Sequence, residues 1–265
     1  MTSDKEQEKK VSQFYNSVGW VANEDGDTLD AEKWEDLRDC SDEYIRKCRK
    51  RLNKYIPKSG ELFFDLGSGP IQYPEYLEYS KNYKERHCMD LSSDALEIAK
   101  KKANNIKTFN GSFFDTDIEP NKYDCSISQH VIYHMDKEDQ ALAINKLLEI
   151  TKKGGKVIIV YGNPNSLLEI PYKIYRLIKK IFKLKTEHDL YHFVYPLKWW
   201  HQFEDKSNVE LYLWRTFNSF YLKKIFPNNF IGKKLLQIIY KLEDVLPKFI
   251  TLAIAQYPTI VLTKK

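Results

Sequence analysis

The sequence lacks several patterns that would assign it to common classes of protein. Its four cysteines form no C-x-x-C pair and no regular framework, so neither a zinc site nor a disulfide scaffold is expected. No run of about 18 consecutive apolar residues is present, which counts against a membrane-spanning helix. The charged first ten residues also lack the apolar stretch of a secretory signal. These absences favour a cytoplasmic protein with reduced cysteines.

Internal repeats and low-complexity linkers are also missing, so the 265 residues are most simply explained by one α/β core with insertions. The composition includes 18 Tyr and 14 Phe, a high aromatic content that favours large apolar pockets or an interface. Charge is unevenly distributed: residues 164–265 hold 17 Lys and Arg against 8 Asp and Glu, whereas residues 1–163 hold 25 against 29. A negatively charged partner would therefore meet the C-terminal part.

Short apolar runs alternate with helical patterns through the middle of the chain. Strands are expected at 61–66, 86–91, 107–110, 123–129 and 156–162, and helices at 31–55, 74–79, 93–104 and 137–151, the last closed by Lys152-Lys153-Gly154-Gly155. Two later strands are expected at 209–215 and 257–263. Strict alternation predicts a parallel sheet covered by helices, with ligands at the carboxyl ends of its strands.

The pattern divides the chain into four expected units. An N-terminal helical cap spans 1–58, and a nucleotide-binding type of core spans 59–163. A helical and aromatic lid insertion is expected at 164–207, including a helix that Pro196 is well placed to open. The last unit, 208–265, holds the two late strands of the core, separated by an insertion with a basic amphipathic helix.

The most informative stretch is Asp65-Leu66-Gly67-Ser68-Gly69, at the end of the first core strand. Glycines at such a turn allow the backbone to approach a ligand closely, and the following helix offers its N-terminus. Gln72 stands where a dinucleotide-binding motif has its third glycine, which counts against a bound pyrophosphate. The acid before the first glycine points to a cationic ligand group. A bare glycine turn is the alternative.

Acidic residues follow the next two expected strands. Asp90 can accept hydrogen bonds from both hydroxyls of a ribose, although capping of the next helix is the alternative. After the third strand, Asp115 could accept from an adenine amino group while Phe114 covers the ring, or the two could be a turn acid and a core aromatic.

Taken in register, these motifs resemble class I S-adenosylmethionine-dependent methyltransferases over about residues 11–162, nearest to the quinone-biosynthesis and sugar-methyltransferase type. The resemblance rests on Asp65-Leu66-Gly67-Ser68-Gly69, the acids after the second and third strands, Ser128 to Met135, and Lys152 to Val160. It implies a Rossmann-like three-layer α/β sandwich, with a mostly parallel seven-stranded sheet whose last strand is antiparallel. Pro70, where the family has a small residue, and the late insertion depart from the pattern.

The resemblance also implies which residues hold the cofactor, S-adenosylmethionine. Asp65, Gly67 and Gly69 would face the methionine moiety, Asp90 the ribose, and Phe114 with Asp115 the adenine. Ser68, Leu91 and Gln129 complete the expected contacts, and Tyr15 and Trp20 would fold over the cofactor as an N-terminal lid. Packing alone is the alternative for the last two.

Two histidines, His130 and His134, follow the fourth strand, beside the place where the methyl group should lie. Methyl transfer needs alignment and desolvation, with a general base where the acceptor is a hydroxyl or an ammonium. Histidine can take that proton near neutral pH, so His130 is the first candidate. It could equally bind the cofactor or the backbone. The spacing could also suit a metal pair, but no third ligand supports it and no metal is expected.

The aromatic stretch from His188 to Phe203 is the expected wall of the acceptor pocket. Its candidates are Tyr191, His192, Tyr195, Trp199 and Trp200, which could exclude water and shape the pocket. An ordinary core helix is the alternative.

Two basic amphipathic helices are expected at 172–185 and 232–246. Each admits three interpretations: a solvated face, contact with a membrane surface, or a site for an anionic acceptor. Nucleic acid is disfavoured, because overall charge is modest and no nucleic-acid-reading module is evident.

The resulting hypothesis is a methyltransferase that acts on an oxygen or nitrogen of a small molecule, such as a sugar or lipid-linked intermediate, in the cytoplasm or on the inner membrane surface. A nicotinamide-dependent oxidoreductase is the second class considered, and Gln72 argues against it. The third is a non-catalytic relative that binds only the cofactor or a partner.

Overall fold

The computed structural model describes residues 31, 34–171, 173 and 191–265. Seven strands form one sheet in the order β3-β2-β1-β4-β5-β7-β6. They are β1 (Gly60–Leu66), β2 (Tyr83–Asp90), β3 (Ile106–Asn110), β4 (Tyr123–Gln129), β5 (Thr151–Val160), β6 (Ser207–Arg215) and β7 (Tyr257–Lys264). The first five pair in parallel, and β7 runs antiparallel to both β5 and β6. The predicted fold class is confirmed.

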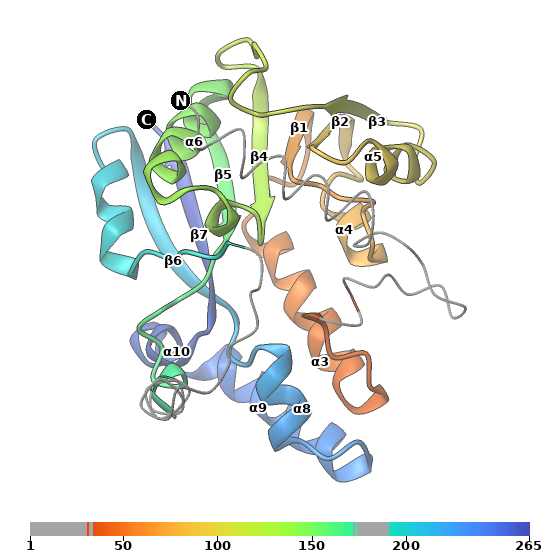
Figure 1. Ribbon diagram of the computed structural model, residues 1–265, viewed down its shortest axis with the longest axis vertical. Coiled ribbons are helices and arrows are strands. Elements are labelled where there is room, and N and C mark those ends of the chain that lie inside the picture. Colours follow the sequence, from red (N-terminus) through yellow and green to blue (C-terminus); the bar gives the residue numbers. More distant parts are fainter. Residues whose placement is uncertain (1–30, 32–33, 172, 174–190) are drawn as a thin grey trace.

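The helices of the described residues lie before, between and after these strands (Figure 1). They are α3 (Asp39–Lys50), α4 (Pro74–Glu78), α5 (Ser93–Lys100), α6 (Lys137–Ile150), α8 (Ser219–Ile225), α9 (Phe230–Val245) and α10 (Lys248–Ile254). Short 3-10 helices span Arg51–Lys54, Ile132–His134 and Leu197–Phe203. Ser92 caps α5, since its hydroxyl accepts a hydrogen bond from the Ala95 amide at 3.2 Å.

Three expectations about the elements need correction. The Lys152-Lys153-Gly154-Gly155 stretch does not close a helix, because α6 ends at Ile150 and β5 begins at Thr151. The β4–β5 pairing shifts register just there, and Gly154 has a φ of 73°, so the glycine serves an irregular strand. Residues 197–203 form a 3-10 helix, and the insertion between the last strands holds three helices where one was expected.

Alternating side chains of the central strands supply two hydrophobic layers. Phe64 packs in the cluster that α6 covers, with Ile144 and Leu148, whereas its neighbour Phe63 packs on the other face with Leu52 and Tyr79. This alternation follows from the two-residue repeat of a strand. The sheet is therefore buried on both sides, as a parallel sheet requires.

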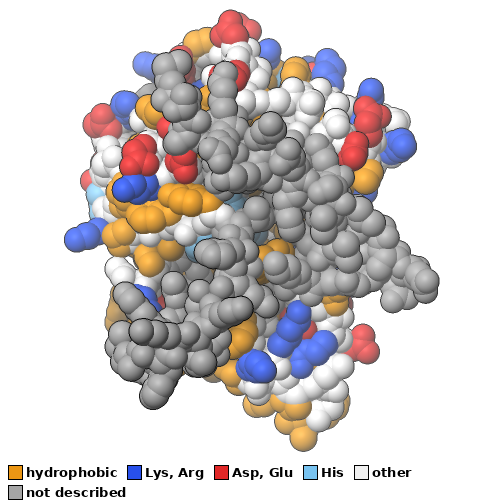
Figure 2. Space-filling model, in the orientation of Figure 1, with side chains coloured by type: hydrophobic (Ala, Val, Ile, Leu, Met, Phe, Trp, Pro, Cys, Tyr) orange, Lys and Arg blue, Asp and Glu red, His pale blue; other side chains and the backbone are white. Residues whose placement is uncertain are grey.

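The cap helix α3 and the late insertion form a joint core beyond the sheet. Tyr44, Ile45 and Cys48 of α3 pack against α8 and α9. A buried ion pair joins the same elements, with 2.8 Å between Arg51 Nη2 and Glu243 Oε2. Figure 1 shows α8, α9 and α10 beyond the end of the sheet toward which β4 points, and Figure 2 shows hydrophobic side chains gathered at that end. The boundaries of the four units stay a prediction.

The ion pair predicts a stability effect. Arg51 is 4% exposed and also donates to the Trp214 carbonyl oxygen at 2.9 Å. Replacing it in Arg51→Ala leaves the buried Glu243 carboxylate without its cation, so we expect the free energy of unfolding to fall by about 3–5 kcal/mol. Urea unfolding measures this loss. Lys54→Ala is the control, because its exposed ammonium pairs with Asp244 at 3.5 Å and should cost less than about 1 kcal/mol. Equal losses in both variants would refute the assignment.

Candidate active site

The ends of β1, β2 and β4 meet at one edge of the sheet, where a glycine turn follows β1. Gly67 and Gly69 have φ values of 68° and 52°, a backbone conformation that L side chains rarely adopt. A Cβ atom on Gly67 would lie 2.2 Å from Cγ2 of Val131, in the loop after β4. The glycine is therefore required both by conformation and by space. The Ser68 hydroxyl, in the same turn, donates to the Gly69 carbonyl oxygen at 3.2 Å.

Asp65 has a partner inside the protein. Its carboxylate is buried and accepts hydrogen bonds from Nε and Nη2 of Arg86 on β2, with 3.2 Å to Nε. The same guanidinium donates to the Tyr76 carbonyl oxygen at 2.5 Å, which ties α4 to the sheet. The expected contact between Asp65 and the methionine moiety stays a prediction, and the structure adds that this acid locks β1 to β2.

Asp90 lies at the end of β2 and holds the glycine turn directly. Its Oδ2 accepts from the Gly69 amide at 2.8 Å, and its Oδ1 accepts from the Ser92 amide at 2.9 Å. Each carboxylate oxygen has a second acceptor position, so both can still accept from a pair of hydroxyls. Burial raises the pKa of this carboxyl group above its ordinary value, against the lowering effect of the backbone amides.

The expected adenine side is built by the loops after β2 and β3. Asn110 donates through its Nδ2 to the carbonyl oxygens of Asp90 and Leu91, at 3.1 and 3.2 Å. Phe114 is partly buried against the core that includes Phe113, whereas Asp115 is exposed. The roles of Leu91, Phe114 and Asp115 stay predictions at this edge.

Gln129, the last residue of β4, carries a buried polar atom of interest. Among the described residues its Oε1 has no hydrogen-bond partner. A buried acceptor left unpaired costs free energy, so such an atom suits a donor supplied by a ligand. An ammonium or hydroxyl group of a cofactor at this edge would satisfy it.

His130 follows Gln129 and adopts a left-handed backbone with a φ of 60°. Non-glycine residues rarely occupy this region, and such outliers gather at functional sites. Its Nδ1 lies 2.8 Å from the Tyr133 hydroxyl, and its ring contacts those of Trp214 and Tyr257, each with 4.9 Å between centroids. Burial, assisted by the Arg215 charge, lowers the pKa of His130 to about 3.

His134 lies one turn further, and its Nδ1 donates to the Tyr191 carbonyl oxygen at 2.8 Å. Burial lowers its pKa to about 4 and also lowers the pKa of His192. Tyr133 packs against His192 with 4.7 Å between ring centroids. Two histidines after β4 and one from the expected lid therefore surround a single tyrosine, and the lowered pKa values leave His130 and His134 neutral at pH 7.

The remaining lid candidates differ in burial: three are partly exposed and one is fully buried. Tyr195 stacks on Trp199 with 4.3 Å between ring centroids, and its hydroxyl donates to the Lys137 carbonyl oxygen at 3.2 Å. Tyr191 also contacts Lys137, whose amide donates to its hydroxyl at 3.3 Å. Trp200 is fully buried in the core beside Tyr161, where it supports the lid segment and has no surface to offer a ligand. The contact of Tyr191, Tyr195 and Trp199 with an acceptor stays a prediction.

A buried charge cluster at the same edge was not predicted. Arg215 ends β6, and its Nη1 lies 3.2 Å from Oε2 of Glu35. Arg49 of α3 lies 3.7 Å from Glu35 and likewise 3.7 Å from Glu75. Tyr133, Trp214 and Tyr257 were missed as well. The expected strand order could have indicated these residues. An antiparallel β7 begins at the edge where the parallel strands end, so its first residue Tyr257 and the paired Arg215 lie beside His130.

Some sequence predictions lie outside the described residues. These are Tyr15 and Trp20 of the N-terminal lid and the basic helix expected within 172–185. Within the described part of the chain, no group of three His, Cys, Asp or Glu residues is arranged to hold a metal ion.

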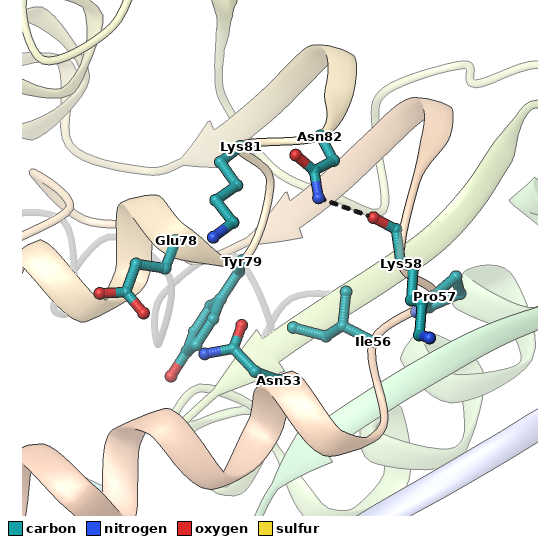
Figure 3. A pocket seen from close by; sticks show the side chains of 8 residues that line it. All are labelled: Asn53, Ile56, Pro57, Lys58, Glu78, Tyr79, Lys81 and Asn82. Atoms are coloured by element: carbon teal, nitrogen blue, oxygen red, sulfur yellow. Dashed lines mark hydrogen bonds between the residues drawn. The ribbon is translucent and has the colours of Figure 1, made fainter.

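One hollow, of about 400 Å³, lies away from this edge (Figure 3). Its lining comes from the residues just before β1 and β2, including Pro57, Lys58, Lys81 and Asn82. Asn82 Nδ2 donates to the Lys58 carbonyl oxygen at 2.9 Å. Because ligands of open α/β sheets bind at the carboxyl ends of the strands, this hollow at the amino ends is not the cofactor site.

Comparisons with known proteins find methyltransferases. Residues 64–159 match the family model described as a methyltransferase domain. A relative described as an uncharacterized methyltransferase, from Anoxybacillus flavithermus, is 25% identical over 107 residues, which cover 40% of this chain and 50% of that protein. The matched stretch thus spans half the length of the curated relative.

Solved structures show the same fold. Geranyl diphosphate C-methyltransferase from Streptomyces coelicolor, in complex with Mg²⁺, geranyl diphosphate and S-adenosyl-L-homocysteine, has a TM-score of 0.58 and 12% identity, covering 98% of both chains. Phosphoethanolamine N-methyltransferase 2 from Haemonchus contortus, in complex with S-adenosyl-L-methionine, has a TM-score of 0.52 and 18% identity, covering 82% of this chain and 52% of that one.

Residues 64–159 match a methyltransferase domain, and the sheet order and the glycine turn agree with the class I S-adenosylmethionine-dependent type. The site residues fit the cofactor of this class. Gly67 and Gly69 leave room for a ligand beside the backbone, and each Asp90 carboxylate oxygen can accept one more hydrogen bond. In the part of the chain that the structure describes, no donor reaches Gln129 Oε1. The match favours methyl transfer over the nicotinamide alternative.

Asp90 should be the strongest single determinant of cofactor binding. In Asp90→Ala both the ribose acceptors and the support of the Gly69 amide are lost, so affinity for S-adenosylhomocysteine should fall by about 1–3 kcal/mol in isothermal titration. Asp94→Ala removes an exposed carboxylate four residues further on and should leave affinity unchanged. Unchanged affinity in the Asp90 variant would remove this residue from the binding site.

The buried imidazoles predict a pH dependence of stability. In the unfolded chain His130 and His134 bind protons at an ordinary pKa of about 6.5, whereas their folded pKa values are about 3 and about 4. Below pH 6.5 or so the unfolded state binds more protons, so the free energy of unfolding falls as pH falls, by up to about 1.4 kcal/mol per pH unit for each histidine.

Urea unfolding at a series of pH values between 4 and 7 measures this slope. His134→Asn should make the slope shallower, since one proton uptake by the unfolded chain is removed. An identical slope in the unmodified protein and the His134 variant would contradict the burial of this imidazole in its neutral form.

Proposed function

We propose that the protein transfers a methyl group from S-adenosylmethionine to an oxygen or nitrogen atom of a small molecule. One observation carries this proposal: the neutral imidazole of His130 lies in the loop whose next residue, Val131, abuts the glycine turn. S-adenosylmethionine supplies an electrophilic methyl group on a positively charged sulfur. When the methyl acceptor is a hydroxyl or an N–H group, a base beside the cofactor can take up the proton that this group loses.

The chain's own residues would act on the acceptor as follows. Tyr133 orients His130 through the 2.8 Å contact to Nδ1. With the Nδ1 proton donated to the Tyr133 hydroxyl, Nε2 is free to accept a hydrogen bond from the acceptor. Burial disfavours the imidazolium form, so the proton should move to His130 only as the acceptor atom bonds to the methyl carbon and becomes acidic. The Glu35 carboxylate raises the pKa of His130 and would favour the charged form at that moment.

Water exclusion is the second task that the site must perform. The aromatic segment of residues 191–203 contacts His134 and Tyr133, and Gln140 Nε2 fixes it by donating to the Phe193 carbonyl oxygen at 2.9 Å. A dry site strengthens every charge interaction around the reacting atoms. We therefore propose Tyr191, His192, Tyr195 and Trp199 as residues of the acceptor side, with His134 holding Tyr191 in place.

The acceptor is proposed to be a sugar or a lipid-linked intermediate, and the reaction to take place in the cytoplasm or at the inner membrane surface. The aromatic content of the lid segment and the basic C-terminal part support this choice. The test supplies methyl-labelled S-adenosylmethionine with host extract and follows the label. Entry into lipid or sugar fractions supports the proposal, and entry only into protein or nucleic acid would overturn it.

His130→Ala should separate catalysis from binding. Loss of the base should lower kcat by about 10²–10⁴-fold, while affinity for S-adenosylhomocysteine should change little. Turnover and isothermal titration measure the two effects, and Tyr133→Phe should lower kcat to a smaller extent by releasing the imidazole. His201→Ala is the matched control at an exposed site. Parallel loss of turnover and cofactor affinity would instead make His130 a binding residue.

A further inference from the structure

Helix α9 presents two apolar stripes to different surroundings. Gly232, Leu236 and Glu243 lie on its buried side, against α3 and α8. The second stripe, here called the α9 apolar face, is 43–76% exposed and consists of Ile231, Leu235, Ile238, Leu242 and Val245. Their spacing of four, three, four and three residues places all five on one side of the helix. An aligned apolar stripe of this kind, exposed among the described residues, marks an interaction surface.

Neighbouring elements extend the apolar surface. Phe220 and Ile225 of α8, Phe230 at the start of α9, and Phe249 of α10 are 51–74% exposed. Figure 2 shows hydrophobic side chains at the lower end of the molecule, where α8 and α9 lie, with Lys and Arg side chains beside them. Large aromatic side chains flanking an amphipathic helix are typical of helices that lie in a membrane interface.

The charge that accompanies this surface has one sign. Exposed lysines of the three helices are Lys223, Lys224, Lys233, Lys234, Lys241 and Lys248. The acids of the same helices are occupied elsewhere, since both Glu243 and Asp244 pair with Arg51. The α9 region therefore offers positive charge and apolar side chains together. This combination complements a lipid leaflet, whose anionic head groups lie above an apolar acyl layer.

A second copy of the chain fits the α9 apolar face poorly. The four-three spacing is that of a coiled-coil seam, so a helix pair must be considered. Lys234 and Lys241 each precede a seam residue, Leu235 and Leu242, and border the seam on one side. In an antiparallel pair these lysines would face their own copies, and like charges held together across a seam disfavour association. The bordering lysines thus favour an anionic occupant.

We propose that the α9 apolar face docks on an anionic lipid surface, with α9 lying in the plane of the interface and the lysines at the phospholipid head groups. None of the described helices is long and apolar enough to cross a membrane. Docking on one leaflet requires only the apolar face to enter, to a depth of about 5–10 Å. This inference does not depend on the methyltransferase activity, because it rests on residues outside the candidate active site.

The test is sedimentation of the full chain with vesicles. We expect the protein to sediment with vesicles that contain phosphatidylglycerol, to stay in solution with pure phosphatidylcholine, and to be released as salt is raised. Leu235→Ser with Leu242→Ser should weaken partitioning more than tenfold, because two exposed apolar side chains no longer enter the lipid. Lys234→Gln with Lys241→Gln should weaken it about fivefold per lysine.

Matched controls alter the same residue types elsewhere. Leu142, 57% exposed on α6, is replaced in Leu142→Ser, and Lys100 and Lys101 at the end of α5 are replaced by Gln. These variants should partition as the unmodified protein does. Because all the altered side chains are exposed, circular dichroism and affinity for S-adenosylhomocysteine should be unchanged in every variant, so loss of vesicle binding is read separately from loss of the fold or of the cofactor site.

Three outcomes would overturn the proposal. The unmodified protein could fail to sediment with anionic vesicles at low salt. The α9 variants could bind as tightly as their controls, which would assign vesicle binding to another surface. In the third outcome, analytical ultracentrifugation shows a dimer that Leu235→Ser dissociates, which would assign the face to a second copy.

Discussion

The close approach of Gly67 to Val131 joins the two halves of the candidate active site. Pairing of β1 with β4 sets Leu66 opposite Ser128, so the loops that follow these two strands must share one small space. Any Cβ at Gly67 would enter the Val131 side chain. The cofactor turn after β1 and the histidine loop after β4 are therefore positioned by one contact. Sheet register thus fixes the separation between the glycine turn and His130.

Buried ion pairs hold the cap and the late insertion to the sheet. Arg86 ties Asp65 to α4, Arg215 reaches Glu35, and Arg51 reaches Glu243 in the late insertion. Each guanidinium is buried and spans elements far apart in sequence. Buried pairs are costly to break because the remaining charge has no solvent. The cap and the insertion are consequently held to the sheet by interactions that require both partners, and the same Arg215 lowers the pKa of His130.

Local sequence patterns predicted most of the sheet because its strands are continuous apolar runs with distinct stops. The 123–129 strand matches β4 without change, and the two late strands fall within a residue or two of β6 and β7. The start of β5 was wrong, since Lys152-Lys153-Gly154-Gly155 has the composition of a helix end, yet pairing with β4 extends the strand through it. Tertiary pairing overrode the local signal there.

The site was only partly accessible to the same reasoning. Asp90 could be predicted as a site residue because it ends a strand, and the end of a strand can be recognised from the neighbouring sequence alone. The Tyr133 contact with His130 depends on a left-handed backbone at a non-glycine residue, which composition does not signal. Arg215 and Tyr257 come from the distant end of the chain, and Glu35 comes from the cap. The antiparallel β7 brings Tyr257 and Arg215 to this edge, and the direction of a strand does not by itself identify the side chains that meet there.

The position of the late insertion connects the proposed docking surface with the proposed chemistry. Helices α8 to α10 lie between the end of β6 and the start of β7, and both of these strand ends are at the edge that carries His130. Figure 1 accordingly shows the insertion beyond the end of the sheet toward which β4 points. A lipid surface bound at the α9 apolar face would thus lie on the side of the molecule where the acceptor must enter. That arrangement would shorten the path for an acceptor held in or near a membrane.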